Sequence, residues 1–246
     1  MSDFLPVIYL ARHGETSWSL TGQHTGLTDL PLTKRGEDNA RALGERLTGL
    51  KFAMVFTSPL QRATRTCQLA GFGAVAEVDH NLLEWDYGQY EGLTTAQIHA
   101  ERPDWQLFRD GSPGGESPEQ VGARADAMLD RVRPLGADVL LFSSGHFLRV
   151  FAARWLALGA VAGKYLLLST ASLSALSYEN NVSGPVIQLW NDTRHVKVSN
   201  HRVTDTIDRP KEDSSWAQRQ RRGKRRQPSL MLSRNFALSM APVRLI

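Results

Sequence analysis

The sequence contains a single cysteine, no internal repeat and no long apolar run. Cys67 has no second cysteine to pair with, so nothing points to an oxidising compartment, and its place in a helical pattern predicts a small buried residue. No run reaches the roughly 18 apolar residues of a membrane span. The first residues lack the basic and apolar segments of a signal peptide. These absences predict a soluble, cytoplasmic protein that does not contact a membrane.

Excess positive charge is also lacking over most of the chain. Residues 1–208 hold 19 Lys and Arg against 23 Asp and Glu, a formal charge of −4, whereas residues 209–246 hold 10 against 2, a charge of +8. The length suits one α/β domain over residues 1–208. The basic run at residues 219–226 has no apolar face, which predicts a disordered tail over residues 209–246. The mildly acidic charge of residues 1–208 argues against a broad nucleic-acid-binding surface there. Only the basic tail could contact nucleic acid or anionic lipid, and its simpler interpretation is a solvated segment.

What the sequence does have is an apolar run, residues 7–11, that ends in Arg12, His13 and Gly14. Such a run is typical of a buried parallel strand, and ligands of α/β proteins bind beyond the carboxyl ends of the strands. Arginine presents a fork of donors that matches phosphate oxygens, and a neutral imidazole has a nitrogen lone pair that can attack phosphorus. Gly14 is expected to let the backbone turn away beneath them. A lone histidine after a strand is usually a buried structural residue, but these neighbours favour a phosphate site.

Apolar runs and helical patterns alternate along the body. This order predicts an α/β fold: a three-layer, doubly wound, mostly parallel sheet with helices on both faces. After the first strand, further strands are expected at residues 52–56, 75–79, 139–144, 173–178 and 186–190. Helices are expected over residues 34–47 with Thr33 as N-cap, from Pro59 with Ser58 as N-cap, from Pro118 behind a capping box at Ser117, and after Gly145.

Two further charged residues follow strand-like segments. Arg62 stands one turn into the helix that starts after the second strand, so its guanidinium can reach the phosphate site, although an arginine on an amphipathic helix is usually only solvated. Glu84 is accompanied by Trp85, Tyr87 and Tyr90, which can shield it from water. Partial desolvation raises the pKa of a carboxyl group towards that of a useful general acid.

Residues 18–29 are rich in threonine, glycine and polar residues, as a loop over a pocket should be. An ordinary surface connection has a similar composition, but this loop follows directly from the histidine motif. Ser19, His24 and Thr25 offer hydroxyl and imidazole donors to ligand oxygens. The segment 105–117, which has many helix and strand breakers, is expected to form a cap over the pocket.

Residues 12–16, Arg-His-Gly-Glu-Thr, resemble the signature of the histidine phosphatase superfamily, and residues from about 7 to 195 follow its order of motifs. Segments 18–29 and 84–92 are most similar to its sedoheptulose-bisphosphatase branch. The resemblance implies a phosphoglycerate mutase-like fold, a covalent phosphohistidine at His13, and a Glu84 that protonates the leaving oxygen and then activates water. Because arginines supply the positive charge and no Asp/His cluster has metal-ligand spacing, no metal and no other cofactor is expected.

The sequence departs from this family at Ser144, where the family has a second catalytic histidine directly before glycine. His146 stands where the sedoheptulose-bisphosphatase branch also has a histidine, so it is not counted as a displaced catalytic residue. Arg149 lies in the same opening helical turn and can reach ligand oxygens or form a surface ion pair. Residue chemistry and resemblance together give these candidate substrate contacts: Arg12, Ser19, His24, Thr25, Arg62, Tyr87, Glu91, Ser144, His146 and Arg149.

These residues predict a phosphatase that hydrolyses small phosphorylated metabolites, namely sugar or polyol phosphates or sugar bisphosphates. A phosphoglycerate mutase-type phosphotransferase is less favoured, because the loop at residues 18–29 resembles the bisphosphatase branch. Ser144 keeps a third possibility open, a pseudoenzyme that binds phosphorylated ligands but turns them over poorly.

Overall fold

A computed structural model describes residues 5–196, and the predicted basic tail from residue 209 lies outside the described residues. The strands are β1 Ile8–Arg12, β2 Met54–Thr57, β3 Ala76–Val78, β4 Val139–Ser143, β5 Leu173–Tyr178 and β6 Pro185–Asp192. The α-helices are α1 Ser17–Thr21, α2 Lys34–Leu47, α3 Gln61–Leu69, α4 Thr95–Glu101, α5 Leu107–Asp110, α6 Pro118–Val132 and α7 Gly145–Trp155. The short 3-10 helices are η1 His80–Leu82, η2 Gly88–Tyr90, η3 Arg133–Leu135 and η4 Ala160–Tyr165.

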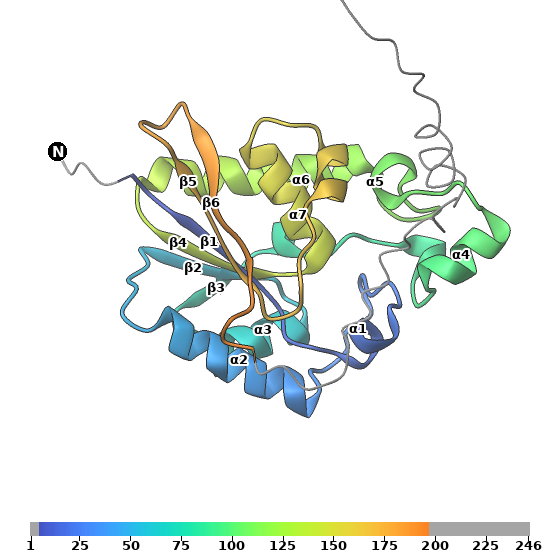
Figure 1. Cartoon of the computed structure of the whole chain (residues 1–246), viewed down its shortest axis with the longest axis horizontal. Helices are drawn as coiled ribbons and strands as arrows, with labels where there is room; N and C mark the ends of the chain where they lie inside the picture. The colour runs from blue at the N-terminus through green and yellow to red at the C-terminus, as the bar shows by residue number, and fades with distance from the viewer. Residues whose placement is uncertain (1–4, 197–246) are drawn as a thin grey trace, which may run out of the picture. The chain divides into compact units, whose positions relative to one another are not determined.

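The strands form one six-stranded sheet in the order β3-β2-β4-β1-β5-β6 (Figure 1). Strands β1 to β4 pair in parallel, while β5 pairs antiparallel with β1 and β6 antiparallel with β5. The predicted α/β class with a mostly parallel sheet is therefore confirmed, with two antiparallel strands at one edge. Arg12 lies opposite Ser143 in the register of β1 and β4, so the residues that follow both strands emerge at the same edge of the sheet.

Helices cover both faces of the sheet, as predicted: α2 and α3 lie on one side, and α6 and α7 lie on the other (Figure 1). The central strand β4 is buried on both faces, so its side chains alternate between two cores. Val139 and Leu141 pack in the cluster that contains residues of α6 and α7, whereas Leu140 and Phe142 pack with residues of α2 and with Cys67 of α3. The prediction of a buried Cys67 is confirmed, and burial raises the pKa of its thiol to about 12.

Two helices begin as their sequences predict. Thr33 caps α2, because its hydroxyl oxygen accepts a hydrogen bond from Gly36 N at 3.0 Å. Ser117 and Gln120 form the capping box of α6, with Pro118 as its first residue. The buried stripe of this helix consists of Val121, Ala125, Met128, Leu129 and Val132.

The predicted start of α3 is wrong, because the helix begins at Gln61 rather than at Pro59 and its N-cap is Leu60 rather than Ser58. The N–H of Gln61 donates to the Asp29 carboxylate at 2.7 Å, and the Gln61 side chain donates to Asp29 O at 2.6 Å. A residue 32 positions earlier in the chain therefore caps this helix, which no local pattern could indicate.

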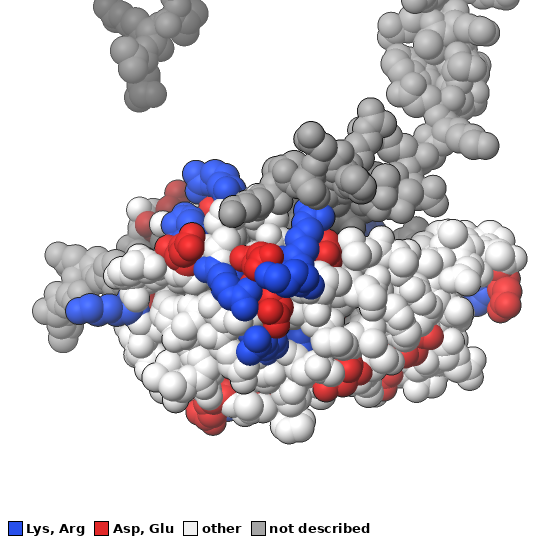
Figure 2. All heavy atoms as spheres, turned by 90° about the horizontal axis from the view of Figure 1, so that it is seen from below, with Lys and Arg blue, Asp and Glu red and all other residues white. Residues whose placement is uncertain are grey.

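Opposite charges are intermixed on the face that α2 and α3 present. Figure 2 views the molecule from this side and shows acidic and basic side chains close together. Glu37 pairs with Arg41 at 3.3 Å and with Arg65 at 3.0 Å, and Asp38 pairs with Lys34 at 2.6 Å. These pairs are largely exposed, so each contributes little to stability. The Glu37–Arg65 pair joins α2 to α3 at the surface, and the other two pairs lie within α2.

Candidate active site

The carboxyl ends of β1, β4 and β2 bring three segments of the candidate site side by side. His13 N donates to Ser143 O at 2.9 Å, and Ser58 N donates to Phe142 O at 2.9 Å. The residues that follow the three strands, His13, Ser144 and Ser58, therefore lie at one edge of the sheet. This is the edge at which α/β proteins bind ligands.

Arg12 occupies the last position of β1 and extends towards the start of α7. Its Nη1 donates to Leu168 O. Gly145 is the first residue of α7, and a Cβ placed on it would lie 3.1 Å from both Cζ and Nε of Arg12. The glycine after Ser144 therefore leaves the space in which the guanidinium lies.

His13 is a buried imidazole, 4% exposed, and one of its ring nitrogens has a defined partner. Its Nδ1 lies 2.7 Å from Gly14 O. Because a carbonyl oxygen can only accept, Nδ1 carries the proton and Nε2 keeps its lone pair. Burial, followed by the charges of Arg62 and Arg12, holds the pKa of His13 well below its usual 6.5. At neutral pH the side chain therefore has the uncharged form that a nucleophile requires.

Gly14 is needed for close packing rather than for a special backbone conformation. It is not among the glycines with positive φ, but a Cβ on it would lie 2.5 Å from Gly36 O of α2. Its N–H donates to Thr66 Oγ1 of α3 at 3.0 Å, and that hydroxyl donates to Arg62 O at 2.6 Å. The chain after His13 thus packs directly against both α2 and α3.

Arg62 is fully buried beneath the loop that follows α1. Its guanidinium donates at 2.7 to 3.1 Å to three carbonyl oxygens of that loop, those of Thr25, Gly26 and Thr28. Burial lowers the pKa of Arg62, but a guanidinium remains charged in proteins. The charges of Arg62 and Arg12 both lower the pKa of His13, whereas contact of Arg62 with a phosphate stays a prediction. The Arg62 Nε has no hydrogen-bond partner within the described part of the chain.

The side chain of Glu91 binds backbone N–H groups of the same loop. Its carboxylate accepts from Gly26 N at 2.9 and 3.0 Å and from Thr28 N at 3.1 Å. Glu91 and Arg62 together therefore fix the loop around residues 25–28. Placement of the substrate by Glu91 stays a prediction.

The hydroxyls of Ser19 and Thr25 both have partners close by in the chain. Ser19 Oγ accepts from Thr16 N at 2.9 Å, and Ser19 N donates to Thr16 Oγ1 at 3.2 Å, which forms the capping box of α1. Ser19 Oγ also donates to Thr16 O at 2.9 Å. Thr25 Oγ1 donates to Gln23 O at 3.2 Å. Donation from either hydroxyl to a ligand stays a prediction and requires one of these bonds to be exchanged.

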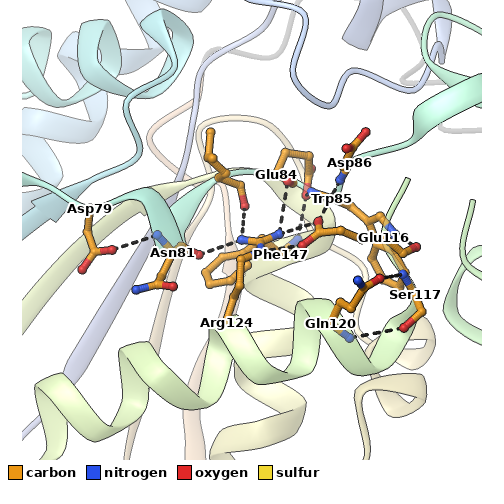
Figure 3. Close-up of polar contacts among 11 residues, drawn as sticks. Asp79, Asn81, Glu84, Trp85, Asp86, Glu116, Ser117, Gln120, Arg124 and Phe147 are labelled. Atoms are coloured by element: carbon orange, nitrogen blue, oxygen red, sulfur yellow. Dashed lines mark hydrogen bonds and ion pairs between the residues drawn. The ribbon is translucent and has the colours of Figure 1, made fainter. Parts of the chain in front are cut away.

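Glu84 is 5% exposed, and its carboxylate rests on the N-terminus of α7. Oε1 accepts from Phe147 N at 2.7 Å and from Trp85 N at 2.9 Å (Figure 3). Oε2 accepts from His146 N at 3.0 Å. The N–H groups of a helix start favour a negative charge. The carboxylate is therefore held by backbone donors as well as shielded by the aromatic residues that the sequence suggests.

His24, Tyr87 and His146 form an uncharged polar cluster. The Tyr87 hydroxyl lies 2.5 Å from His146 Nδ1, and the His24 ring centroid lies 4.8 Å from that of Tyr87 and 6.0 Å from that of His146. Burial lowers the pKa of His24 to about 4 and, together with Arg149, lowers that of His146 well below 6.5. Burial, followed by the charge of Glu84, raises the pKa of Tyr87 well above 10. All three side chains are therefore neutral at neutral pH.

The segment 105–117 packs against this cluster. The Trp105 ring lies 5.6 Å from His24, and the Phe108 ring lies 5.4 Å from His146. Both aromatic residues are also buried in the core cluster that contains α6. The segment therefore packs beside His24 and His146, whereas its role as a cap over a substrate stays a prediction.

Ser144 is the N-cap of α7 and Arg149 is the fifth residue of that helix, and the two side chains differ in their hydrogen-bond partners. Ser144 is fully buried, and its Oγ has no hydrogen-bond partner within residues 5–196. Arg149 donates to Gly163 O at 3.0 Å and to Lys164 O at 3.1 Å, and its guanidinium lies 4.5 Å from the Phe108 ring centroid. Arg149 therefore ties α7 to η4, and its contact with a ligand stays a prediction.

Three residues that support the site have no assigned role in the sequence analysis. Thr66 bridges Gly14 and Arg62, and its position one turn after Arg62 is the only signal the sequence offers. Glu116 and Arg124 contact the backbone around Glu84. They flank the capping box of α6, but nothing local to them indicates a partner 30 or 40 residues away.

Within residues 5–196, no group of three or more His, Cys, Asp or Glu side chains could hold a metal ion. In the same part of the chain, no helix has the length and apolar character needed to cross a membrane.

Comparison with known proteins gives a family match over most of the chain. The model of the histidine phosphatase superfamily (branch 1) matches residues 8–193. An acid phosphatase of Mycobacterium tuberculosis is 42% identical over 179 residues, which is 71% of this chain and 88% of that protein. The sedoheptulose 1,7-bisphosphatase of Saccharomyces cerevisiae is 37% identical over 192 residues, 65% of this chain and 70% of that protein. A probable phosphoglycerate mutase of Salmonella choleraesuis is 33% identical over 202 residues, 77% and 94% of the two chains.

Solved structures share the fold. The structure of an open reading frame of Mycobacterium tuberculosis has a TM-score of 0.72 and 39% identity, covering 76% of this chain and 97% of that one. A mycobacterial glucosyl-3-phosphoglycerate phosphatase has a TM-score of 0.66 and 27% identity, covering 76% and 99%. The fold is therefore that of phosphoglycerate mutase-like proteins, as predicted.

Proposed function

The chain belongs to the histidine phosphatase superfamily, and we propose that it hydrolyses small phosphorylated metabolites, sugar phosphates or bisphosphates, through a phosphohistidine at His13. The observation that carries this proposal is the neutral His13 imidazole, whose Nδ1 bonds to Gly14 O and whose Nε2 keeps its lone pair. The relatives named acid phosphatase and sedoheptulose 1,7-bisphosphatase support the substrate class.

In the first step, Nε2 of His13 attacks phosphorus in line, so that an N–P bond forms while the P–O bond to the substrate breaks. Arg12 and Arg62 hold the non-bridging oxygens and balance their negative charge. The Arg62 Nε–H supports this role, because it is a buried donor without another partner among the described residues. The departing oxygen takes a proton from Glu84.

The hydrogen bonds to the Glu84 carboxylate support Oε2 as the oxygen that carries this proton. A carboxylate has four lone-pair sites, two on each oxygen. Oε1 accepts two backbone hydrogen bonds, from Trp85 N and Phe147 N, whereas Oε2 accepts one, from His146 N. The remaining site on Oε2 is where we place the transferred proton.

In the second step, water attacks the phosphohistidine and gives its proton to Glu84 while the N–P bond breaks. Inorganic phosphate leaves, and His13 returns to its neutral form. The positive charge that stabilises both transition states comes from Arg12 and Arg62, so the proposal requires no metal.

Ser144 supports a second candidate, a protein that binds phosphorylated ligands but turns them over poorly. Its buried hydroxyl has no partner within the described residues, so a phosphate oxygen could provide one. A serine donates one neutral hydrogen bond and carries no charge, unlike the histidine of the family. Losing one preorganised donor typically costs about 10² to 10³ in rate. The phosphatase proposal therefore expects a slow enzyme.

The test is to incubate the full chain in EDTA with a panel of sugar phosphates, sugar bisphosphates, polyol phosphates and phosphoglycerates. A phosphatase releases inorganic phosphate from at least one of them, and His13→Ala releases none. Movement of the phosphoryl group between positions without release would instead indicate a phosphotransferase. Saturable binding with neither reaction would support the second candidate.

A further inference from the structure

We propose that Arg124 and Glu116 are a positioning pair for Glu84: they hold the backbone of residues 81–86 so that the Glu84 carboxyl group meets the leaving oxygen. The inference rests on the proposed role of Glu84 as proton donor. Neither residue of the pair is a candidate site residue above, and neither is placed in contact with substrate. Figure 3 shows the contacts on which the inference depends.

All five N–H donors of Arg124 are engaged around this segment. Its Nε and one Nη2 hydrogen bond to the two Glu116 oxygens, at 2.7 and 2.8 Å, in a fork-to-fork arrangement. Its Nη1 donates to Asn81 O at 2.8 Å and to Leu83 O at 3.0 Å, and Nη2 also donates to Glu84 O at 3.3 Å. One side chain of α6 therefore fixes three carbonyl oxygens between residues 81 and 84.

Glu116 holds the other end of the segment. Its Oε2 accepts from Asp86 N at 2.9 Å, and its backbone N donates to Asp86 O at 2.9 Å. Its backbone O accepts from the Trp85 indole at 2.9 Å. The residues on both sides of Glu84 are thus tied to the pair, while the Glu84 carboxylate is tied to the start of α7.

Arg124 also contacts the element that holds the carboxylate. Its guanidinium lies 5.1 Å from the Phe147 ring centroid, and the backbone N of Phe147 is the closest donor to Glu84 Oε1. Arg124 and Glu116 are only about one-fifth exposed, at 20% and 19%. The pair therefore differs from a surface ion pair, because it joins the main chain of Glu84 to α6 and touches the residue that binds its side chain.

Position matters here because proton transfer requires the acid and the leaving oxygen within hydrogen-bond distance, and a displacement of about 1 Å can cost about 10²-fold in rate. The leaving group determines how much such a displacement lowers the reaction rate. An alkoxide needs the proton, whereas a nitrophenolate leaves without it. A fault in positioning Glu84 should therefore slow alkyl phosphates and spare aryl phosphates.

The variant that tests the pair is Arg124→Lys, which keeps the charge but has three donors and no planar fork. We expect kcat for alkyl phosphates to fall about 10- to 100-fold, with p-nitrophenyl phosphate changed by less than about threefold and KM little changed. The ratio of the two rates is independent of how much of the variant is folded. Glu116→Gln is the second variant, and the same change in ratio, of smaller size, is expected from it.

Glu84→Gln and the double variant show whether the effect passes through Glu84. Glu84→Gln should produce the same selective loss, and Arg124→Lys should add little on top of it, because the proton donor is already missing. The matched control is Arg154→Lys, since Arg154 forms a similar two-pronged pair with Asp126 of α6 at 2.8 Å on both contacts and lies away from residues 81–86. It should leave the alkyl-to-aryl ratio unchanged.

Two kinds of failure are distinguishable. A selective loss in Glu84→Gln without one in Arg124→Lys or Glu116→Gln would overturn the positioning pair and leave the proposed function standing. An equal loss on both substrate classes in Arg124→Lys would mean a purely structural role. If the unaltered chain turns over no phosphate ester, or Glu84→Gln loses both classes equally, the proposed role of Glu84 is wrong and the inference fails with it.

Discussion

The carboxyl ends of β1 and β4 lie side by side in the sheet, but the polar groups that follow the two strands differ in their hydrogen-bond partners. After β1, His13 Nδ1 bonds to Gly14 O and Gly14 N bonds to Thr66. After β4, Ser143 Oγ donates to Leu82 O at 2.6 Å, whereas the buried Ser144 Oγ has no partner within residues 5–196.

The proposed phosphoryl transfer needs two kinds of group: one that attacks phosphorus and others that stabilise the charge on the phosphate oxygens. The two strand ends differ in which of these they provide. The end of β1 fixes the tautomer and neutral form of His13, the proposed nucleophile. The end of β4 carries a hydroxyl whose burial without a partner typically costs about 1 to 3 kcal/mol. A phosphate oxygen would satisfy it, so the end of β4 is suited to binding but lacks the charge that would help the reaction. Under the proposed mechanism, the site would keep its nucleophile and lack the charge of one stabilising group.

The largest expected effect comes from removing the nucleophile at the end of β1. His13→Ala should lower the rate of phosphate release by at least about 10³-fold, because no other group there can take the phosphoryl group. Affinity for inorganic phosphate should change far less, since Arg12 and Arg62 remain. Steady-state phosphate release and competitive inhibition by phosphate check both statements. A variant that keeps its turnover would refute the role of β1.

The end of β4 should respond in the opposite direction. Ser144→His restores the family residue and should raise kcat by at least about tenfold with a smaller change in KM, because the added donor acts mostly in the transition state. The control is Ser144→Ala, which removes the unpaired hydroxyl and should not accelerate the reaction. If Ser144→His is no faster, then Ser144 does not contact the phosphoryl group or the site is impaired elsewhere, and the ligand-binding candidate becomes the better one.

A third effect tests whether the imidazoles near both strand ends are neutral in the fold. Folding lowers the pKa values of His13, His24 and His146 below those of histidines in the unfolded chain. As pH falls below about 6.5 the unfolded chain therefore takes up protons that the folded protein does not, and the free energy of unfolding falls. Each histidine contributes about 1.4 kcal/mol per pH unit in that range. For His24 the loss continues to about pH 4.

Urea unfolding between pH 7.5 and 5 measures how the free energy of unfolding changes with pH. His24→Gln should reduce this slope by about 1.4 kcal/mol per pH unit, which corresponds to one proton. The matched control is His80→Gln, which replaces an exposed histidine. An unchanged slope in His24→Gln would show that this imidazole becomes charged in the folded protein.

The smallest effect is expected from the basic tail, which should alter neither strand end. Residues 209–246 lack the periodic apolar pattern that offsets the entropy of ordering a chain. Truncation after Asp208 should therefore shift Tm by less than about 2 °C and leave phosphate release near that of the full chain. Calorimetry and an activity assay check this. A large drop in Tm would show that the apolar residues 230–232 or 236–238 dock on the domain.

Sequence reasoning succeeds here where the signal is local. The apolar run before Arg12 and His13 predicts both β1 and its polar end, and the capping box at Ser117 predicts the start of α6. It fails where the partner is distant. Asp29 caps α3, so the local pattern at Ser58 and Pro59 gives the wrong helix start.

The surroundings of Glu84 show the same limit. Its aromatic neighbours in the sequence suggest desolvation, but the N–H groups that bind its carboxylate include those of His146 and Phe147, more than 60 residues away. Arg124 of α6 donates to Glu84 O, and Glu116 accepts from Asp86 N. No periodic pattern marks such side-chain contacts to the main chain.

Trapping the phosphohistidine tests the role of His13 most directly. A substrate labelled with ³²P is mixed with the full chain and quenched in alkali within milliseconds to seconds, and the labelled peptide is identified. A covalent mechanism predicts an acid-labile, alkali-stable label on the peptide that contains His13, formed at least as fast as phosphate is released and absent from His13→Ala. Phosphate release without any such label, or a label on a different residue, would contradict it.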